Sequence, residues 1–222
     1  MSRAGLRAAF AAAALLVAGG AFAQGRGEFR GGAPGDFDYY VLALSWSPTF
    51  CASEAAWRGG DQCTPGRRLG FVVHGLWPQL ERGRIEDCGA FERPPPRIAL
   101  EEAADVFPSE GLARHQWRKH GTCTGNSPAA YFRDVRRAWE KVRVPEEFGK
   151  GGGERHVSTR DIGRAFVEAN PGLRSDMLAV ACRRNILQEV RICFEKDLRR
   201  FRSCPRLRSN CPLNDIVVTG VR

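Results

Sequence analysis

The sequence is poor in lysine and histidine, and most of it lacks long apolar segments. Only four of its 34 basic residues are lysines, and only four of its 222 residues are histidines. After residue 23 no apolar stretch approaches the roughly 18 residues of a membrane-spanning helix, so we expect no membrane insertion of the remaining chain. No two cysteines form a Cys-x-x-Cys pattern, which argues against a zinc ribbon and a thioredoxin-type redox site.

The charge balance is basic. There are 34 Lys and Arg residues against 25 Asp and Glu, which gives a formal net charge of +9. Such a surface attracts anionic partners such as nucleic acid or anionic lipid. Because nearly all of the cations are arginines, base composition of the coding DNA also explains part of the excess. The 43% hydrophobic and 27% charged residues are ordinary globular usage, which excludes a disordered, collagen-like or coiled-coil protein.

Residues 1–23 have the pattern of a secretory signal. They combine an arginine-containing start, an apolar run at residues 8–18 and an Ala-Phe-Ala cleavage site at residues 21–23. The apolar run is too short to span a bilayer. We therefore expect an exported protein, either periplasmic or extracellular.

The composition of the remaining chain predicts one domain after a short leader. Residues 24–36 are glycine-rich and predict a flexible leader, and residues 37–222 show no internal repeat and no second change of composition. Strand and helix patterns are interleaved without regular βαβ spacing, which favours an α+β fold with an antiparallel central sheet and flanking helices.

The expected elements follow from hydrophobic periodicity and from capping residues. Strands are predicted at 39–46, at 69–74 (ended by Gly75), at 178–182, at 187–193 and at 215–218. Helices are predicted at 112–119, at 128–142 with Ser127 as N-cap, and from Ser158 to just before Asn170. The glycine-rich stretch 146–154 is expected to be a mobile loop.

All eight cysteines follow the predicted signal segment. An even number of cysteines in an exported chain favours four disulfides over metal ligation. Eight cysteines allow 105 pairings, so their spacing alone does not select one.

Three of the four histidines occur in two short segments, FVVHGLWPQ (71–79) and HQWRKHGTC (115–123). At about 100° per residue on a helix, His115, Gln116, Lys119 and His120 share one face, while Trp117 and Arg118 point elsewhere. His74 ends the predicted strand, where its side chain can emerge at a sheet edge. The pattern predicts a site with two histidines and an adjacent ammonium group.

Phosphodiester transfer within RNA requires these groups and no protein nucleophile. One imidazole removes the proton of the 2′-hydroxyl and the other protonates the departing 5′-oxygen, and histidine suits both roles because its pKa lies near physiological pH. A positioned cation stabilises the negative charge that develops on the phosphoryl oxygens. A basic, exported protein would attract such an anionic polymer.

The two segments resemble the active-site segments of the ribonuclease T2 family. The likeness extends over most of residues 37–222, including YVLALSWSPTFC, the SPAAYF helix start and the cysteine-rich tail. It implies a metal-independent endoribonuclease without a cofactor that cleaves single-stranded RNA to 2′,3′-cyclic phosphates and then 3′-phosphates. We expect the protein to act as a monomer.

The resemblance also implies a role for each residue. It makes His74 and His120 the acid–base pair and Lys119 the stabiliser of the phosphorane. His115 would orient the phosphate, and a base would stack on Trp77, a contact worth ~1–3 kcal/mol. Four disulfides are implied as well: Cys51–Cys63, Cys88–Cys123, Cys182–Cys211 and Cys193–Cys204.

One position departs from the family pattern. Gln116 stands where the second segment usually has Glu, and an amide carries no charge and does not take up a proton. Loss of a carboxylate near His120 is expected to lower the pKa of that histidine. We expect activity with a shifted pH profile; the alternative is a catalytically weakened relative that binds RNA or acts as a toxin.

Other readings of these residues remain open. His115 and His120 have a zinc-ligand spacing, with Cys88 or Cys123 as their only sulfur partners. For Trp77, the alternative to base stacking is that its ring only packs in the core. The remaining residues of note are expected to pack in the core (Trp46, Trp57, Trp117 and Trp139) or to lie on solvated surfaces (His156, Arg183, Arg184, Arg199 and Arg200).

Overall fold

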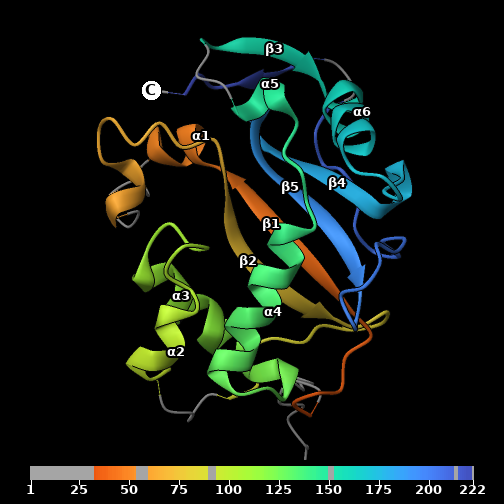
Figure 1. Ribbon diagram of the computed structural model, residues 1–222. Coiled ribbons are helices and arrows are strands. Elements are labelled where there is room, and N and C mark those ends of the chain that lie inside the picture. The colour runs from red at the N-terminus through yellow and green to blue at the C-terminus, as the bar shows by residue number, and fades with distance from the viewer. Residues whose placement is uncertain (1–32, 54–59, 90–93, 150–152, 213–214, 222) are drawn as a thin grey trace, which may run out of the picture.

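The computed structural model describes residues 33–53, 60–89, 94–149, 153–212 and 215–221 (Figure 1). The predicted signal segment 1–23, most of the predicted leader 24–36, and Trp57 lie outside these residues. None of the helices in the described part of the chain has the length and apolarity that crossing a bilayer requires.

A six-stranded sheet forms the centre of the fold, and its long strands β1, β2 and β5 lie side by side in Figure 1. The strand order is β2-β1-β5-β6-β3, and β4 also pairs with β5. The strands are β1 (Tyr39–Trp46), β2 (Phe71–Gln79), β3 (Arg155–Ser158), β4 (Leu178–Arg183), β5 (Ile186–Glu195) and β6 (Asp215–Val218). The pairings are antiparallel except for a parallel contact of β5 with β6, so the α+β prediction is confirmed with one parallel contact in the sheet.

Short helices surround the sheet. They are α1 (Ser47–Cys51), α2 (Arg97–Glu101), α3 (Glu110–Lys119), α4 (Pro128–Glu140), α5 (Glu146–Gly149) and α6 (Thr159–Ala169), with 3-10 turns at Gly60–Cys63, Gly121–Thr124 and Ser175–Met177. Ser127 caps α4 as predicted, since its side chain accepts a hydrogen bond from the backbone N–H of Ala130. Ser158, predicted as the first residue of its helix, is the N-cap of α6 and accepts from the backbone N–H of Asp161. The third helix begins two residues earlier than predicted, since Ser109 caps it.

The local structure of residues 146–158 differs from the prediction. The stretch 146–154 is not simply a loop: it contains α5, because Phe148 is fully buried against the rings of Phe71 and Phe166. Residues 150–152 lie outside the described residues. The short strand β3 was not predicted, and on it His156 is exposed, as expected.

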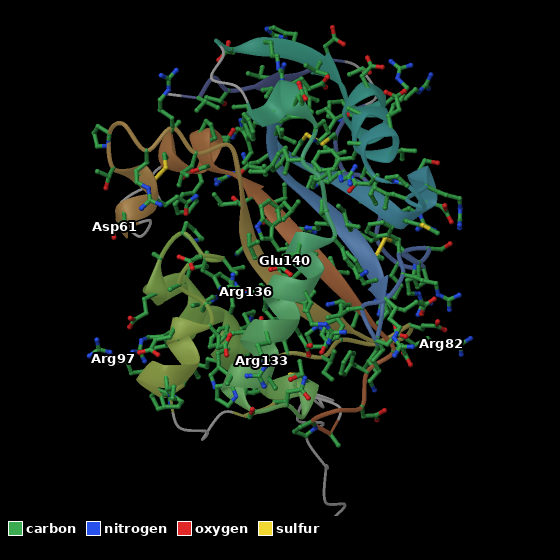
Figure 2. All side chains as sticks on the ribbon, in the orientation of Figure 1. Asp61, Arg82, Arg97, Arg133, Arg136 and Glu140 are labelled. Atoms are coloured by element: carbon green, nitrogen blue, oxygen red, sulfur yellow. A yellow bond between two sulfur atoms is a disulfide. The ribbon has the colours of Figure 1, made fainter. Side chains whose placement is uncertain are left out.

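Helix α4 packs its apolar side against the sheet and joins it to α2. Tyr131 is fully buried and donates a hydrogen bond to the carbonyl of Leu76 in β2, at 3.1 Å. On the outer side, Arg133 and Arg136, which Figure 2 labels, donate hydrogen bonds to Glu102 at the end of α2. Trp46 and Trp117 are buried and Trp139 packs against the core, which confirms their expected packing roles.

The four disulfides that the resemblance implied are present. They join Cys51 to Cys63, Cys88 to Cys123, Cys182 to Cys211 and Cys193 to Cys204, and no cysteine among the described residues is free. The second bond joins the segment after β2 to the turn after α3. It therefore holds together the two segments in which the histidines occur.

Candidate active site

A β-bulge positions His74. In the pairing of β1 with β2, Ala43 lies opposite Gly75 and Leu44 lies opposite Val73, so His74 is the extra residue of β2. Bulges redirect side chains next to active sites. The prediction that the strand ends at His74 was wrong, since β2 continues to Gln79.

Gly75 permits close packing at this point rather than ending the strand. A Cβ atom there would lie 2.1 Å from Oε1 of Gln116 and 2.7 Å from Nε1 of Trp77. No side chain fits at such distances without displacing its neighbours. Only glycine therefore lets the bulge approach α3 this closely.

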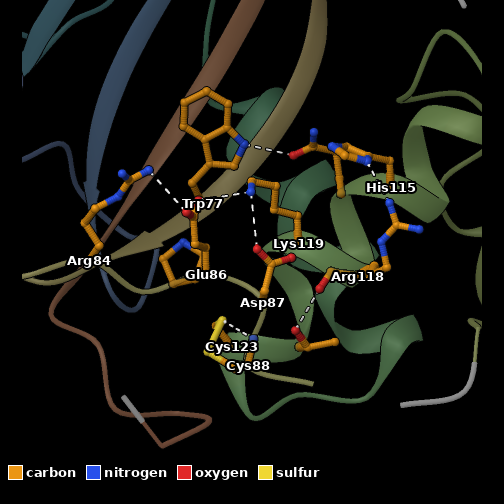
Figure 3. Close-up of polar contacts among 12 residues, drawn as sticks. Trp77, Arg84, Glu86, Asp87, Cys88, His115, Arg118, Lys119 and Cys123 are labelled. Carbon is orange, nitrogen blue, oxygen red and sulfur yellow. Dashed lines mark hydrogen bonds and ion pairs between the residues drawn. A yellow bond between two sulfur atoms is a disulfide. The ribbon is translucent and has the colours of Figure 1, made fainter. Parts of the chain in front are cut away.

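Trp77 lies between the two histidines of the predicted pair. Its ring centroid is 5.3 Å from that of His74 and 5.3 Å from that of His120. Its Nε1 donates a hydrogen bond to Oε1 of Gln116, at 2.8 Å (Figure 3). The structure thus brings together His74, Trp77, Gln116 and His120 from two segments of the sequence.

The predicted common face of α3 is only partly correct. Gln116 is 1% exposed and faces Trp77 rather than solvent. His120 lies beyond the last helical residue, with φ −126° and ψ −41°, so helical angles no longer place its side chain. Arg118 does not point away from the site residues, because its Nη2 lies 3.2 Å from Nδ1 of His115 (Figure 3).

His120 is kept neutral by its surroundings. It is 8% exposed, and burial is the main cause that lowers its pKa to about 3, followed by the nearby charges of Lys119, His74 and His115. Its Nδ1 is buried and has no hydrogen-bond partner in the described part of the chain. A neutral imidazole next to Trp77 is suited to accept a proton.

Lys119 is held by two acidic residues that the sequence analysis missed. Its Nζ lies 3.2 Å from Oε2 of Glu86 and 3.3 Å from Oδ2 of Asp87, and the hydrogen bond to Glu86 is the main cause that raises its pKa (Figure 3). The lysine is therefore positively charged at physiological pH. The sequence did contain a signal for this contact, because the Cys88–Cys123 bond implied by the resemblance brings residues 86–88 next to Lys119.

His115 is exposed at the surface of α3. Partial desolvation and the charges of Arg118, His74 and Lys119 lower its pKa. At neutral pH it is therefore a neutral group that can form a hydrogen bond.

Glu189 on β5 completes the surroundings of His74, and it was also missed. Its Oε1 lies 2.5 Å from Nδ1 of His74, and its Oε2 accepts from Nε and Nη2 of Arg191 at 2.8 and 2.7 Å. Burial alone would raise the pKa of Glu189, but the hydrogen bond and charge of His74, together with Arg191, lower it. The signal in the sequence was an acid in the middle of the strand pattern ILQEVRICF, in which most of the other residues are apolar.

A cavity of about 260 Å³ opens beside His74. Its lining includes hydroxyl and amide groups as well as apolar side chains, among them Ser45, Gln62, Val72, Ser109, Leu112 and Gln188. Such a mixture can hold a flat, polar-edged group.

The described residues contain no cluster of three or more His, Cys, Asp or Glu side chains arranged to hold a metal ion. The sulfur atoms of Cys88 and Cys123, which the zinc reading of His115 and His120 requires, are bonded to each other. A zinc site at His115 and His120 would therefore lack its sulfur ligands.

Comparison with known proteins gives matches over most of the chain. A model of the Ribonuclease T2 family matches residues 37–204. The chain is 53% identical over 96 residues to a "Ribonuclease" of Aeromonas hydrophila, covering 43% of this chain and 42% of the relative. It is 32% identical over 171 residues to a "Probable ribonuclease" of Haemophilus influenzae, covering 72% of this chain and 58% of the relative.

The chain thus spans about half the length of these two relatives. A crystal structure of a mutant of RNase MC1 in complex with 5′-UMP has the same fold, with a TM-score of 0.63 and 21% sequence identity. That match covers 80% of this chain and 97% of RNase MC1.

Proposed function

The chain belongs to the ribonuclease T2 family, and from this premise we propose that it is an endoribonuclease that cleaves single-stranded RNA without a metal ion. The observation that carries the proposal is the contrast between two histidines on either side of Trp77. His74 contacts a carboxylate, whereas His120 is buried among positive charges. One is thereby suited to give a proton and the other to accept one.

In the first step, neutral His120 accepts the proton of the 2′-hydroxyl. The 2′-oxygen forms a bond to phosphorus while the bond from phosphorus to the 5′-oxygen breaks. The protonated form of His74, in contact with Glu189, gives its proton to that 5′-oxygen. The products are a 2′,3′-cyclic phosphate and a free 5′-hydroxyl.

In the second step the roles reverse. His74, now neutral, takes a proton from water, which attacks the cyclic phosphate. The bond from phosphorus to the 2′-oxygen breaks, and His120 returns its proton to that oxygen. A 3′-phosphate results, and both histidines regain their starting states.

Lys119 and His115 hold the phosphate in this proposal. Lys119 stays positively charged and is kept in place by Glu86 and Asp87, so it stabilises the extra negative charge of the phosphorane. His115, exposed on α3, orients the phosphate through a hydrogen bond.

The half-buried ring of Trp77 and the cavity beside His74 are the proposed contacts for bases. A base that stacks on Trp77 shares the ring with Arg191, whose guanidinium lies 5.3 Å from the ring centroid. In the cavity, Ser45 and Gln188 offer groups that can hydrogen-bond the edge of a base.

Gln116 is compatible with turnover. Its Oε1 accepts the Trp77 hydrogen bond, which an amide oxygen does as well as a carboxylate oxygen. We therefore favour the active enzyme over a relative that only binds RNA. The four disulfides and the signal pattern of residues 1–23 support export to the periplasm or the medium, and we expect a monomer.

The test is cleavage of single-stranded RNA by oxidised protein in excess EDTA from pH 4 to 9. We expect turnover with cyclic-phosphate ends that is lost in His74→Ala and retained in His156→Ala, a control at an exposed position on β3. Turnover that requires added divalent metal would contradict the metal-free mechanism. RNA binding without turnover at any pH would favour the binding protein instead.

A further inference from the structure

Glu189 is a charged residue in a place that normally excludes charge. It is 8% exposed, and its neighbours Leu187 and Val190 on β5 are fully buried. Burial of a carboxylate is unfavourable unless opposite charges and hydrogen bonds compensate for the lost water. Here both oxygens are engaged, one by His74 and the other by Arg191.

The contact with Glu189 fixes the orientation of the His74 ring. Nδ1 faces the carboxylate, so Nε2 is the ring nitrogen available to a substrate. The ring meets Trp77 edge to face, and 34% of the His74 side chain remains exposed. His120 has no such partner for its Nδ1 within the described residues.

The other groups around His74 do not supply negative charge. Arg191 lies on the same strand as Glu189, and His115 and His120 interact electrostatically with His74 from α3 and its C-terminal end. Gln116, packed against Trp77, is neutral. Among the described residues, Glu189 is the only carboxylate that forms an ion pair with His74 or His120.

We propose that Glu189 is a positioning residue for His74: it presents Nε2 to the substrate and stabilises the protonated ring that gives a proton to the departing 5′-oxygen. This inference rests on the proposed function. Arg191 supports the carboxylate from its other side and also lies over Trp77, so it links the proton donor to the proposed base-stacking surface.

The test compares two substrates that differ in their leaving group. A dinucleoside phosphate such as UpA needs a proton on its 5′-oxygen, whereas uridine 3′-(4-nitrophenyl phosphate) releases a stable anion. In Glu189→Gln we expect kcat for UpA to fall at least about tenfold with KM nearly unchanged. For the nitrophenyl ester we expect kcat/KM to stay within about twofold.

The pH profile gives a second readout. For UpA, we expect the shape of the pH profile of kcat/KM to change in Glu189→Gln, because the group in contact with Nδ1 of His74 no longer carries a charge. Glu195→Gln is the matched control: it removes a carboxylate from the same strand, where the side chain is 38% exposed and pairs with Arg202. Glu195→Gln should leave the kinetics on both substrates and the pH profile unchanged.

Different results would overturn the inference. An equal loss on both substrates would indicate a general structural role for Glu189, and unchanged UpA kinetics would exclude a positioning role. If Glu189→Gln does not fold, Glu189→Asp withdraws the carboxylate by one methylene and should give the same substrate-selective loss. Failure of the wild-type protein to cleave UpA would instead overturn the proposed function, and this inference with it.

Discussion

Replacing Gln116 by Glu should raise the pKa of His120. The two side chains have nearly the same shape, so Oε1 can still accept the hydrogen bond from Trp77 and the main change is one negative charge. The backbone N–H of His120 still bonds to the carbonyl of residue 116, at 2.9 Å, which keeps the two residues one turn apart. Both side chains also contact Trp77, residue 116 through Nε1 and His120 at a ring-centroid distance of 5.3 Å, so we take the two charges to lie about 6 Å apart.

The size of the shift follows from Coulomb's law. Two unit charges at about 6 Å in an effective dielectric constant of about 20 interact by roughly 3 kcal/mol. This energy corresponds to about 2 pKa units. The pKa of His120, now about 3, should therefore rise toward about 5. That value is an upper limit, because burial of the new carboxyl at position 116 raises its own pKa and reduces its ionised fraction.

The assay is the pH dependence of kcat/KM for a dinucleotide, from pH 3 to 9, with an NMR titration of the His120 ring in both proteins. The base must be neutral to act, so the acid limb should move to higher pH by about one to two units in Gln116→Glu. An acid limb that stays in place while the NMR titration moves would refute the assignment of His120 as the base. If neither moves, the electrostatic account of position 116 is wrong.

Two further substitutions test how the site is held together. In Gly75→Ala, the new Cβ would lie 2.1 Å from Oε1 of Gln116. We therefore expect urea unfolding to show a stability loss of about 1–3 kcal/mol, and kcat/KM to fall at least about tenfold. Wild-type kinetics in this variant would show that the close approach is not needed. Removing the disulfide with Cys88→Ala and Cys123→Ala should lower the unfolding free energy by about 2–4 kcal/mol. It should also lower kcat in the folded protein, since Lys119 loses its fixed acidic partners; unchanged kcat would mean that the bond only stabilises the fold.

The sequence was sufficient to predict elements whose signals are local. Ser127 caps its helix as expected, and the helix predicted from Ser158 begins one residue later, because a helix start depends on residues a few positions away. Both histidine segments were found for the same reason, since each is a short continuous pattern. The disulfide pairing depended on the resemblance, because spacing alone leaves many pairings open.

Features that depend on contacts between distant residues could not be predicted. The bulge at His74 arises from the register of β1 against β2, and glycine at position 75 was mistaken for a strand end because its close approach to α3 is invisible in the sequence. The contact between His74 and Glu189 joins residues 115 positions apart. The only signal in the sequence was an acid in the middle of a mostly apolar strand.

The different roles of the two histidines follow from the elements that carry them. His74 lies on a bulge of β2, and Glu189 reaches its Nδ1 from β5, the second strand along the sheet beyond β1. His120 follows the end of α3, where the chain turns into the interior and the nearest charges are positive. The carboxylate beside His74 suits it to the role of proton donor in the proposed reaction, whereas burial among cations keeps His120 neutral. The acid and the base of the proposed reaction are thus distinguished by the fold, although the residue type is the same.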